Sequence, residues 1–273
     1  MSLTNIILIK PNSQTALSTK LAYWLEKSAF YLLLALIVWV PIPLGSNRPW
    51  SWSLMEVMVM IIAYLWLMSM VLHPRPLPQA VKKAKVPLIL FACWLGYLFL
   101  QTVPLPASII NFINPTGYDL YNYTLGDKQS LPITLDQGLS NIEFLKSIAY
   151  ITTFFLTLCL INTRDRIKAI VWTLFLTGFA QALYAILSIK GIVLWNPSPN
   201  SVSGTYVNRN HLAGLLEMTI PLGIGLFFYK MRRSRSSETW QQKIRNLSEF
   251  IMERQSQILI MTIVMFGIGR AHV

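Results

Sequence analysis

The side chains best suited to bind an anion gather in one stretch, SVSGTYVNRNHLAGLLE, at residues 201–217. Arg209 stands there between Asn208 and Asn210, with His211 beside them and Glu217 eight residues after the arginine. A loop rich in Gly, Ser and Asn runs at this point into an apolar segment. Charged groups at that depth in a membrane are costly unless a partner or a function requires them. We therefore expect the candidate site in this stretch.

The chemistry open to these residues is anion binding and proton transfer. The planar guanidinium of Arg209 suits an anion held at a helix N-terminus, where Asn208 or Asn210 would act as the cap. Glu217 is expected to be buried, and it is either a general base or the ion-pair partner of an arginine. His211 is a weaker candidate base, because a residue beside a capping Asn can serve the helix end alone.

Two polar stripes are expected to face protein or a water-filled cavity rather than lipid. The first lies on the predicted helix after Asn208 and comprises Asn210, Gly214, Glu217 and Pro221. The second lies on the preceding apolar segment and comprises Thr177, Gln181, Tyr184 and Ser188. For the second stripe, interhelical hydrogen bonding and substrate contact stay open as alternatives. Glu56, about one turn into another apolar segment, poses the same choice between base and ion-pair partner as Glu217.

Two further cations fall at predicted span starts. Arg48 precedes the second span, where Pro49 suits the first helical turn, and Lys146 stands at the predicted start of the fourth. With Arg209 at the sixth, three outward helix N-termini would each carry a cation and would line one anion-binding basin. For Arg48 and Lys146 the alternative is a snorkelling anchor at the interface.

Composition points to a membrane protein. Hydrophobic residues make up 54% of the chain and charged residues 12%, and the mean hydropathy is +0.49. The formal net charge is +12, but the positive residues cluster between apolar runs, so membrane loops explain them better than nucleic acid does. Cys93 and Cys159 fall within apolar runs and are interpreted as small membrane-buried side chains.

The apolar runs predict an all-α fold, a polytopic transmembrane helix bundle of about seven spans. The spans are expected at 28–44, 51–72, 86–103, 144–161, 167–189, 212–229 and from about Ile258. Of the 23 Lys and Arg residues, 17 fall in segments that are cytoplasmic if the N-terminus is cytoplasmic, and 6 fall elsewhere. The positive-inside rule therefore predicts a cytoplasmic N-terminus.

The expected organisation is a cytoplasmic tail, 1–27, followed by one transmembrane domain, 28–273. Its outer loops are predicted at 104–143 and 191–210, and a basic cytoplasmic segment at 230–257. The sequence has no Gly-rich phosphate loop, HExxH, CxxC or Asp-x-Asp motif, and His73, His211 and His272 are widely dispersed. We expect no metal and no cofactor, so Arg and Lys would bind the anion.

The stretch SGTYVNRNHLAGLLEMTIPL resembles the central motif of the O-antigen ligase/polymerase family of bacterial membrane glycosyltransferases. Three other stretches are similar to the same family: PIPLGSNRPWSWSLME, LQTVPLPASIINFINPTG and GFAQALYAIL. The family moves a glycan from undecaprenyl diphosphate to an acceptor on the outer side of the inner membrane. The acceptor is lipid A core, a growing polysaccharide or a protein. By this resemblance, Arg209 would bind and neutralise the pyrophosphate, and Arg48, Lys146, Asn208 and Asn210 would contact the substrate.

Three functions stay open from the sequence: a ligase, a polymerase of the same family, and a transporter or membrane scaffold for lipid-linked sugars. Family members usually continue through further helices and a large outer loop with a candidate catalytic histidine. The chain is therefore expected to be a truncated member that does not turn over alone, and His272 is not equated with that histidine. Membrane lipids are expected partners, and nucleic acid is not.

Overall fold

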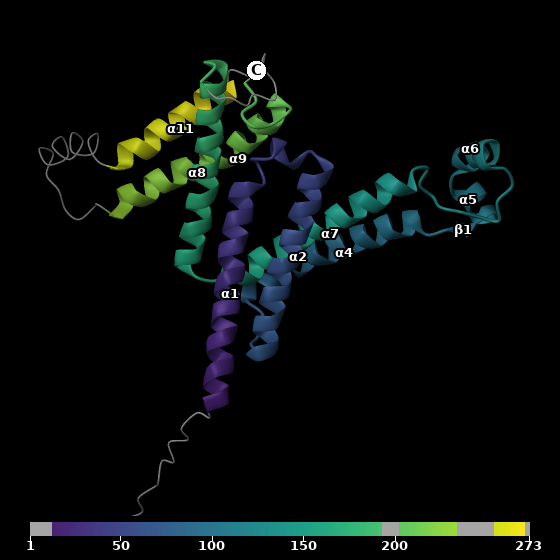
Figure 1. Cartoon of the computed structure of the whole chain (residues 1–273), viewed down its shortest axis with the longest axis horizontal. Coiled ribbons are helices and arrows are strands. Elements are labelled where there is room, and N and C mark those ends of the chain that lie inside the picture. The colour runs from purple at the N-terminus through teal and green to yellow at the C-terminus, as the bar shows by residue number, and fades with distance from the viewer. Residues whose placement is uncertain (1–12, 193–201, 234–253, 271–273) are drawn as a thin grey trace, which may run out of the picture. The chain divides into compact units, whose positions relative to one another are not determined.

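The computed structural model describes residues 13–192, 202–233 and 254–270, and helices make up most of them (Figure 1). Within these ranges six helices are long and apolar enough to cross a membrane, and a shorter apolar stretch, Gln257–Phe266, lies in α11. The chain is thus an all-α, multi-pass membrane protein, which confirms the fold class predicted from the apolar runs.

The chain divides into two compact units. Unit 1 comprises residues 1–30 and 56–162, and unit 2 comprises residues 31–55 and 163–273. Two helices contribute to both units, α1 (Ser13–Trp39) and α2 (Pro49–Leu72). The remaining elements of unit 1 are α3 (Gln79–Lys83), α4 (Lys85–Thr102), β1 (Leu105–Pro106), α5 (Ala107–Ile113), α6 (Pro115–Leu125), β2 (Ser130–Leu131) and α7 (Gln137–Leu160). Those of unit 2 are α8 (Arg164–Ile189), α9 (Arg209–Arg233) and α11 (Arg254–Arg270).

In unit 1, α4 and α7 pack side by side (Figure 1). Phe91 of α4 meets Phe154 of α7 edge-on, with ring centroids 5.3 Å apart. Such aromatic pairs add stabilisation beyond the area that they bury. The two helices therefore form an antiparallel pair whose far end carries the segment 103–136.

The segment 103–136 forms a small folded cap with its own core. β1 and β2 pair antiparallel, Leu105 opposite Leu131, and Ile110, Tyr121 and Leu131 are buried together. The Asn114 side chain accepts from the Gly117 N–H at 3.0 Å and caps α6. The folded segment 103–136 covers most of the predicted outer loop 104–143, so that loop is largely structured.

An ion pair joins α1 to the segment after α2 within unit 1. The Arg75 guanidinium lies 2.5 Å from the carboxylate of Glu26, whose side chain is 9% exposed. Arg75 also donates to the Ser69 hydroxyl at 3.2 Å. The middle of α1 and the segment after α2 are therefore held together.

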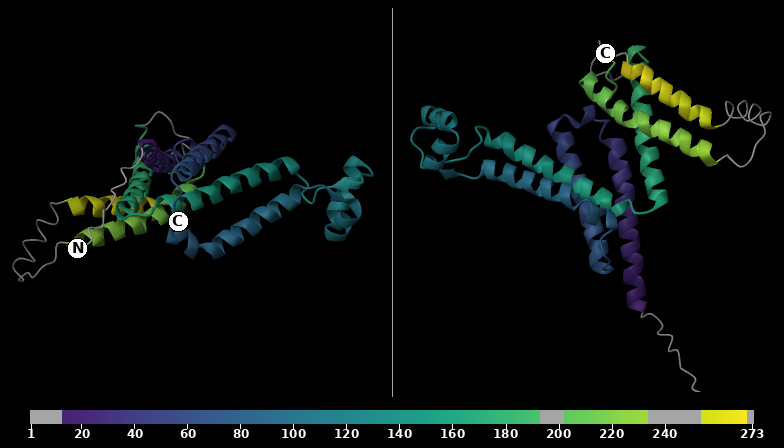
Figure 2. Two further views of the ribbon diagram at one scale, coloured as in Figure 1. Left: turned by 90° about the horizontal axis from the view of Figure 1, so that it is seen from below. Right: turned by 180° about the vertical axis from the view of Figure 1, so that it is seen from behind.

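In unit 2, α9 packs along both α8 and α11, and α9 and α11 run side by side (Figure 2). The core between them includes Phe175, Leu212, Leu216 and Met265. Two glycines allow the close approach: a β-carbon on Gly178 would overlap Thr219, and one on Gly223 would overlap Thr262 and Phe175. Small residues commonly bring membrane helices together in this way.

Several predicted boundaries were wrong. α1 begins at Ser13 rather than Ser28, so much of the expected tail 1–27 is helical, and residues 1–12 lie outside the described ranges. α7 begins at Gln137 rather than Phe144, because Asp136 accepts from the Leu139 N–H at 2.8 Å and caps it there. Parts of the predicted segments 191–210 and 230–257, and His272, are also outside those ranges.

Candidate functional site

A turn with left-handed backbone angles follows α1. Leu44, Gly45 and Ser46 all have positive φ angles, between 57° and 62°. The turn is held by Gly45 N–H donating to Pro41 O at 3.1 Å and by Ser46 Oγ donating to Val40 O at 2.8 Å. Positive φ is strained for Leu and Ser, so it persists only where surrounding contacts enforce it. We refer to residues 40–48 as the 40–48 turn.

The loop before α9, residues 202–208, packs against this turn. The Thr205 hydroxyl lies 2.6 Å from Pro41 O and 2.9 Å from Gln181 Oε1, and the Thr205 N–H donates to Gln181 Oε1 at 3.3 Å. Thr205 is 5% exposed, so these groups are satisfied away from water. The 202–208 loop is therefore joined to both the 40–48 turn and α8.

Tyr206 forms the second contact between loop and turn. A β-carbon on Gly45 would overlap the Tyr206 ring, so that position requires glycine both for its space and for its φ of +62°. The Tyr206 and His211 rings are 6.4 Å apart at 35°. Burial raises the pKa of the Tyr206 phenol to about 12, so it stays neutral at physiological pH.

Both arginines of the expected site lie at helix starts beside this contact. Arg48 immediately precedes α2, and the buried Ser51 side chain accepts from the Arg48 N–H at 3.1 Å and donates to Arg48 O at 2.8 Å. Pro49 is the first residue of α2, as predicted. The Arg48 side chain is exposed and is not needed for this cap. Arg48 follows Gly45 by three residues.

Arg209 is the first residue of α9. The Asn208 side chain accepts from the Asn210 N–H at 2.9 Å, which makes Asn208 the cap and decides between the two predicted asparagines. Arg209, Asn210 and His211 are exposed. Arg209 follows Tyr206 by three residues, as Arg48 follows Gly45. The Gly45–Tyr206 contact thus joins two helix starts, each with an exposed arginine.

Lys146 does not start a helix, so that part of the prediction was wrong. It lies in the third turn of α7, after a start at Gln137, and its ammonium group pairs with Glu143 at 2.8 Å. Its side chain is 19% exposed. Lys146 belongs to unit 1, whereas Arg48 and Arg209 belong to unit 2. The predicted basin of three cations is therefore reduced, for unit 2, to the two arginines.

Glu217 is exposed, which contradicts its predicted burial. The face of α9 that packs in unit 2 is the neighbouring one, with Leu212, Leu216 and Thr219 buried. The stripe through Asn210, Gly214, Glu217 and Pro221 is exposed or half-buried. Spacing identified a polar stripe correctly but not its direction, because the apolar and small face supplies the packing.

The stripe on α8 does face protein. Thr177, Gln181 and Ser188 are buried, and Tyr184 is half-buried. Gln181 bonds Thr205, and Ser188 donates to Ala185 O at 2.8 Å. For Gln181, of the two alternatives left open, the structure supports hydrogen bonding between segments of the protein.

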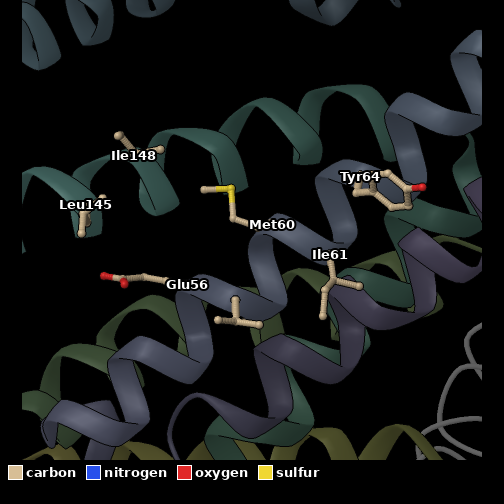
Figure 3. Close-up of a pocket in the computed structure, with 7 residues that line it drawn as sticks. Glu56, Met60, Ile61, Tyr64, Leu145 and Ile148 are labelled. Carbon is tan, nitrogen blue, oxygen red and sulfur yellow. The ribbon is translucent and has the colours of Figure 1, made fainter.

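Glu56 lines a pocket of unit 1 (Figure 3). The pocket has a volume of about 430 Å³ and is otherwise lined by apolar side chains and Tyr64. The carboxylate points from α2 toward α7, and its Oε1 is buried without a hydrogen-bond partner in the described part of the chain (Figure 3). Lys146 and Glu143 are near enough to act on it electrostatically. Among the described residues, no three His, Cys, Asp or Glu side chains gather as a metal site.

Sequence reasoning missed Thr205, Tyr206 and Pro41. They lie inside the two quoted motif stretches, but their roles depend on contacts across more than 160 residues, such as Thr205 to Pro41, at a separation of 164. The positive charge of the arginines was visible in the sequence, whereas the contacts of the 202–208 loop with the 40–48 turn, which join the two helix starts, were not.

No family model, curated protein or solved structure matches the chain.

Proposed function

We propose that this chain is a membrane glycan transferase of the O-antigen ligase type. It would transfer a glycan from undecaprenyl diphosphate to lipid A core, a polysaccharide or a protein at the outer face of the bacterial inner membrane. One observation carries the proposal: the 40–48 turn and the 202–208 loop, which hold two of the family-like motifs, pack together through Thr205–Pro41 and Tyr206–Gly45.

The two arginines suit a pyrophosphate leaving group. Arg48 and Arg209 stand exposed at helix N-termini, where the helix dipole favours an anion. A guanidinium binds phosphate oxygens in bidentate fashion and stabilises the negative charge that develops as the glycosidic bond breaks. Asn208 holds Arg209 at the helix start, so its role is positioning, because its side-chain oxygen is already used as the cap.

The acceptor side of the reaction requires a base. The acceptor hydroxyl forms the new glycosidic bond and loses its proton, while the pyrophosphate leaves with the electron pair of the old bond. His211 lies in the first turn of α9 and Glu217 in the third, and neither side chain is buried by the described part of the protein, so either could reach a substrate bound beside α9. His211 is the nearer of the two to Arg209 in the chain, and imidazole is the most common general base in enzymes.

The proposal is tested by substitution of Arg209. Arg209→Lys keeps the positive charge but loses the planar guanidinium that binds two phosphate oxygens at once, and Arg209→Ala loses both. Both should lower glycan transfer at matched membrane level, Ala by about 100-fold or more if the arginine stabilises the leaving group. Lys190→Ala, an exposed cation after α8, is the matched control and should keep full transfer.

Equal transfer by wild type and Arg209→Ala would reduce the arginine to a membrane anchor and would contradict the proposal. The product separates the two family activities: a ligase transfers one donor glycan to a different acceptor, whereas a polymerase lengthens the lipid-linked chain. Movement of the lipid-linked glycan without release of lipid diphosphate would indicate a transporter instead.

A further inference from the structure

Unit 2 contains a second pocket, at the other end of α8 and α9 from the 202–208 loop. It is a groove of about 510 Å³ between the first half of α8 and the second half of α9. Arg164 and Lys168 line it at one end, and mostly apolar residues of the two helices line the rest. Its volume lies in the range of about 300–1,000 Å³ that is usual for small-molecule sites.

The groove has an apolar wall and a basic end. Val171, Leu222 and Leu226 supply an aliphatic surface within two helices that are long enough to span a membrane. Arg164 and Lys168 lie one turn apart at the beginning of α8, so both cations occupy one face of that helix. A ligand that fits must combine a hydrocarbon part with a negative head.

The cations at this end are available to such a ligand. Arg164 is exposed, and the Lys168 side chain is 47% exposed. Lys168 pairs with Asp165 at 3.4 Å, but the Asp165 side chain is 95% exposed. An ion pair so open to water contributes little and exchanges readily. Thr163 caps the helix by accepting from the Arg166 N–H at 3.3 Å, which leaves Arg164 and Lys168 out of the cap.

We propose that this groove binds one anionic phospholipid, with an acyl chain along α8 and α9 and its phosphate between Arg164 and Lys168. The positive-inside count puts this end of α8 at the cytoplasmic face, where anionic lipids attract basic residues. Trp172 and Tyr229 provide amphipathic rings at the groove, as is usual near lipid headgroups. Free phosphate would leave the apolar wall unused, so the occupant is a lipid. This site is separate from the proposed transfer site and does not depend on it.

Gly225 gives a direct test of the groove itself. It lines the pocket, and a β-carbon added there would meet nothing within 4 Å. Gly225→Leu should therefore fill the groove without disturbing the packing of α9. Gly214→Leu is the matched control, because Gly214 lies on the same helix outside the groove and is equally unobstructed.

The experiment uses the full chain, purified in detergent, and counts bound phosphatidylglycerol and phosphatidylcholine by native mass spectrometry. Wild type should retain one phosphatidylglycerol in preference to phosphatidylcholine. Arg164→Gln and Lys168→Gln should each weaken phosphatidylglycerol binding about fivefold. Asp165→Asn, which removes the competing carboxylate, should strengthen it. Gly225→Leu should abolish the retained lipid, and Gly214→Leu should not.

Other results would overturn the proposal. Loss of binding in Arg164→Gln with full binding in Gly225→Leu would place the headgroup on the helix surface and exclude the groove. Equal retention of both lipids would exclude a charge-selective site. Displacement of phosphatidylglycerol by millimolar inorganic phosphate would indicate a simple anion site. If wild type were a dimer and Gly225→Leu a monomer in the same spectra, the groove would be a contact between copies of the chain.

Discussion

Thr205 links three segments of unit 2 through one buried side chain. It reaches Pro41 O and Gln181 Oε1, while Pro41 O also accepts from the Gly45 N–H. Thr205→Val keeps the shape and removes the hydroxyl, so it should lower the free energy of unfolding by about 1–3 kcal/mol. Denaturation of the detergent-solubilised chain by SDS measures the change. If the turn and loop position Arg209, glycan transfer should also fall.

Thr177→Val is the matched control for that substitution. Thr177 lies on the same α8 stripe and is 7% exposed, but its hydroxyl has no hydrogen-bond partner within the part of the chain that the structure describes. Removal of an unsatisfied buried hydroxyl should leave stability unchanged or raise it slightly. A loss of stability as large as that of Thr205→Val would mean that the Thr205 effect comes from removing any buried hydroxyl rather than from its hydrogen bonds to Pro41 and Gln181.

Tyr206 gives the unit a dependence on alkaline pH. Its folded-state pKa is raised from 10.0 to about 12 by burial, so the folded state binds the phenolic proton more tightly than the unfolded state. Stability from this group is therefore complete below about pH 10 and falls as the pH rises through about 12. Tyr206→Phe should reduce this decline, measured as the SDS midpoint against pH. A wild-type profile identical to that of Tyr206→Phe would contradict the shift.

At the residue scale, the sequence predicted two local features of helix starts but not the contacts between distant residues. Pro49 in the first helical turn was confirmed, and of the two asparagines predicted as caps the structure selects Asn208. The direction of Glu217 was wrong, because an amphipathic pattern in a membrane helix does not say whether lipid, water or protein covers the polar face. Thr205 was missed because its partners are distant in sequence.

At the element scale, glycines set how closely α8, α9 and α11 pack. A β-carbon on Gly223 would overlap Thr262 of α11 and Phe175 of α8. Gly223→Ala should therefore push the helices apart and lower the free energy of unfolding by about 1–3 kcal/mol. Gly214→Ala has open space and should be neutral or slightly stabilising. Equal SDS midpoints for the two variants would show that α9 is not held by this close packing.

Helix existence was predictable, whereas helix ends were not. Each apolar run of membrane length became a helix, since a backbone in lipid must satisfy its own hydrogen bonds. The ends depend on caps and on the polar residues beyond the apolar core. α1 is 27 residues long, roughly 40 Å at the helical rise, which exceeds a hydrocarbon core of about 30 Å. Apolar counting alone therefore placed its start too late.

At the scale of the whole molecule, topology decides whether the two arginines can meet an outer substrate. The charge count predicts a cytoplasmic N-terminus, and the Glu26–Arg75 ion pair joins the middle of α1 to the segment after α2. That segment leads into α3, whose Lys83 is exposed, while Asp127 is exposed beyond α6. Lys83 and Asp127 should then lie on opposite membrane faces, because α4 separates them.

Cysteine labelling tests this arrangement in cells. The native cysteines, exposed Cys93 and buried Cys159, are first replaced by alanine so that only the introduced thiols can react. Single cysteines are then placed at Lys83 and Asp127. A thiol reagent that cannot cross membranes should label Asp127→Cys in intact cells and Lys83→Cys only after permeabilisation, because the excess of Lys and Arg holds the Lys83 segment inside. Labelling of Lys83→Cys in intact cells would show that the topology is the reverse of the predicted one. Arg48 and Arg209 would then face the cytoplasm, and an outer-face donor site would be excluded.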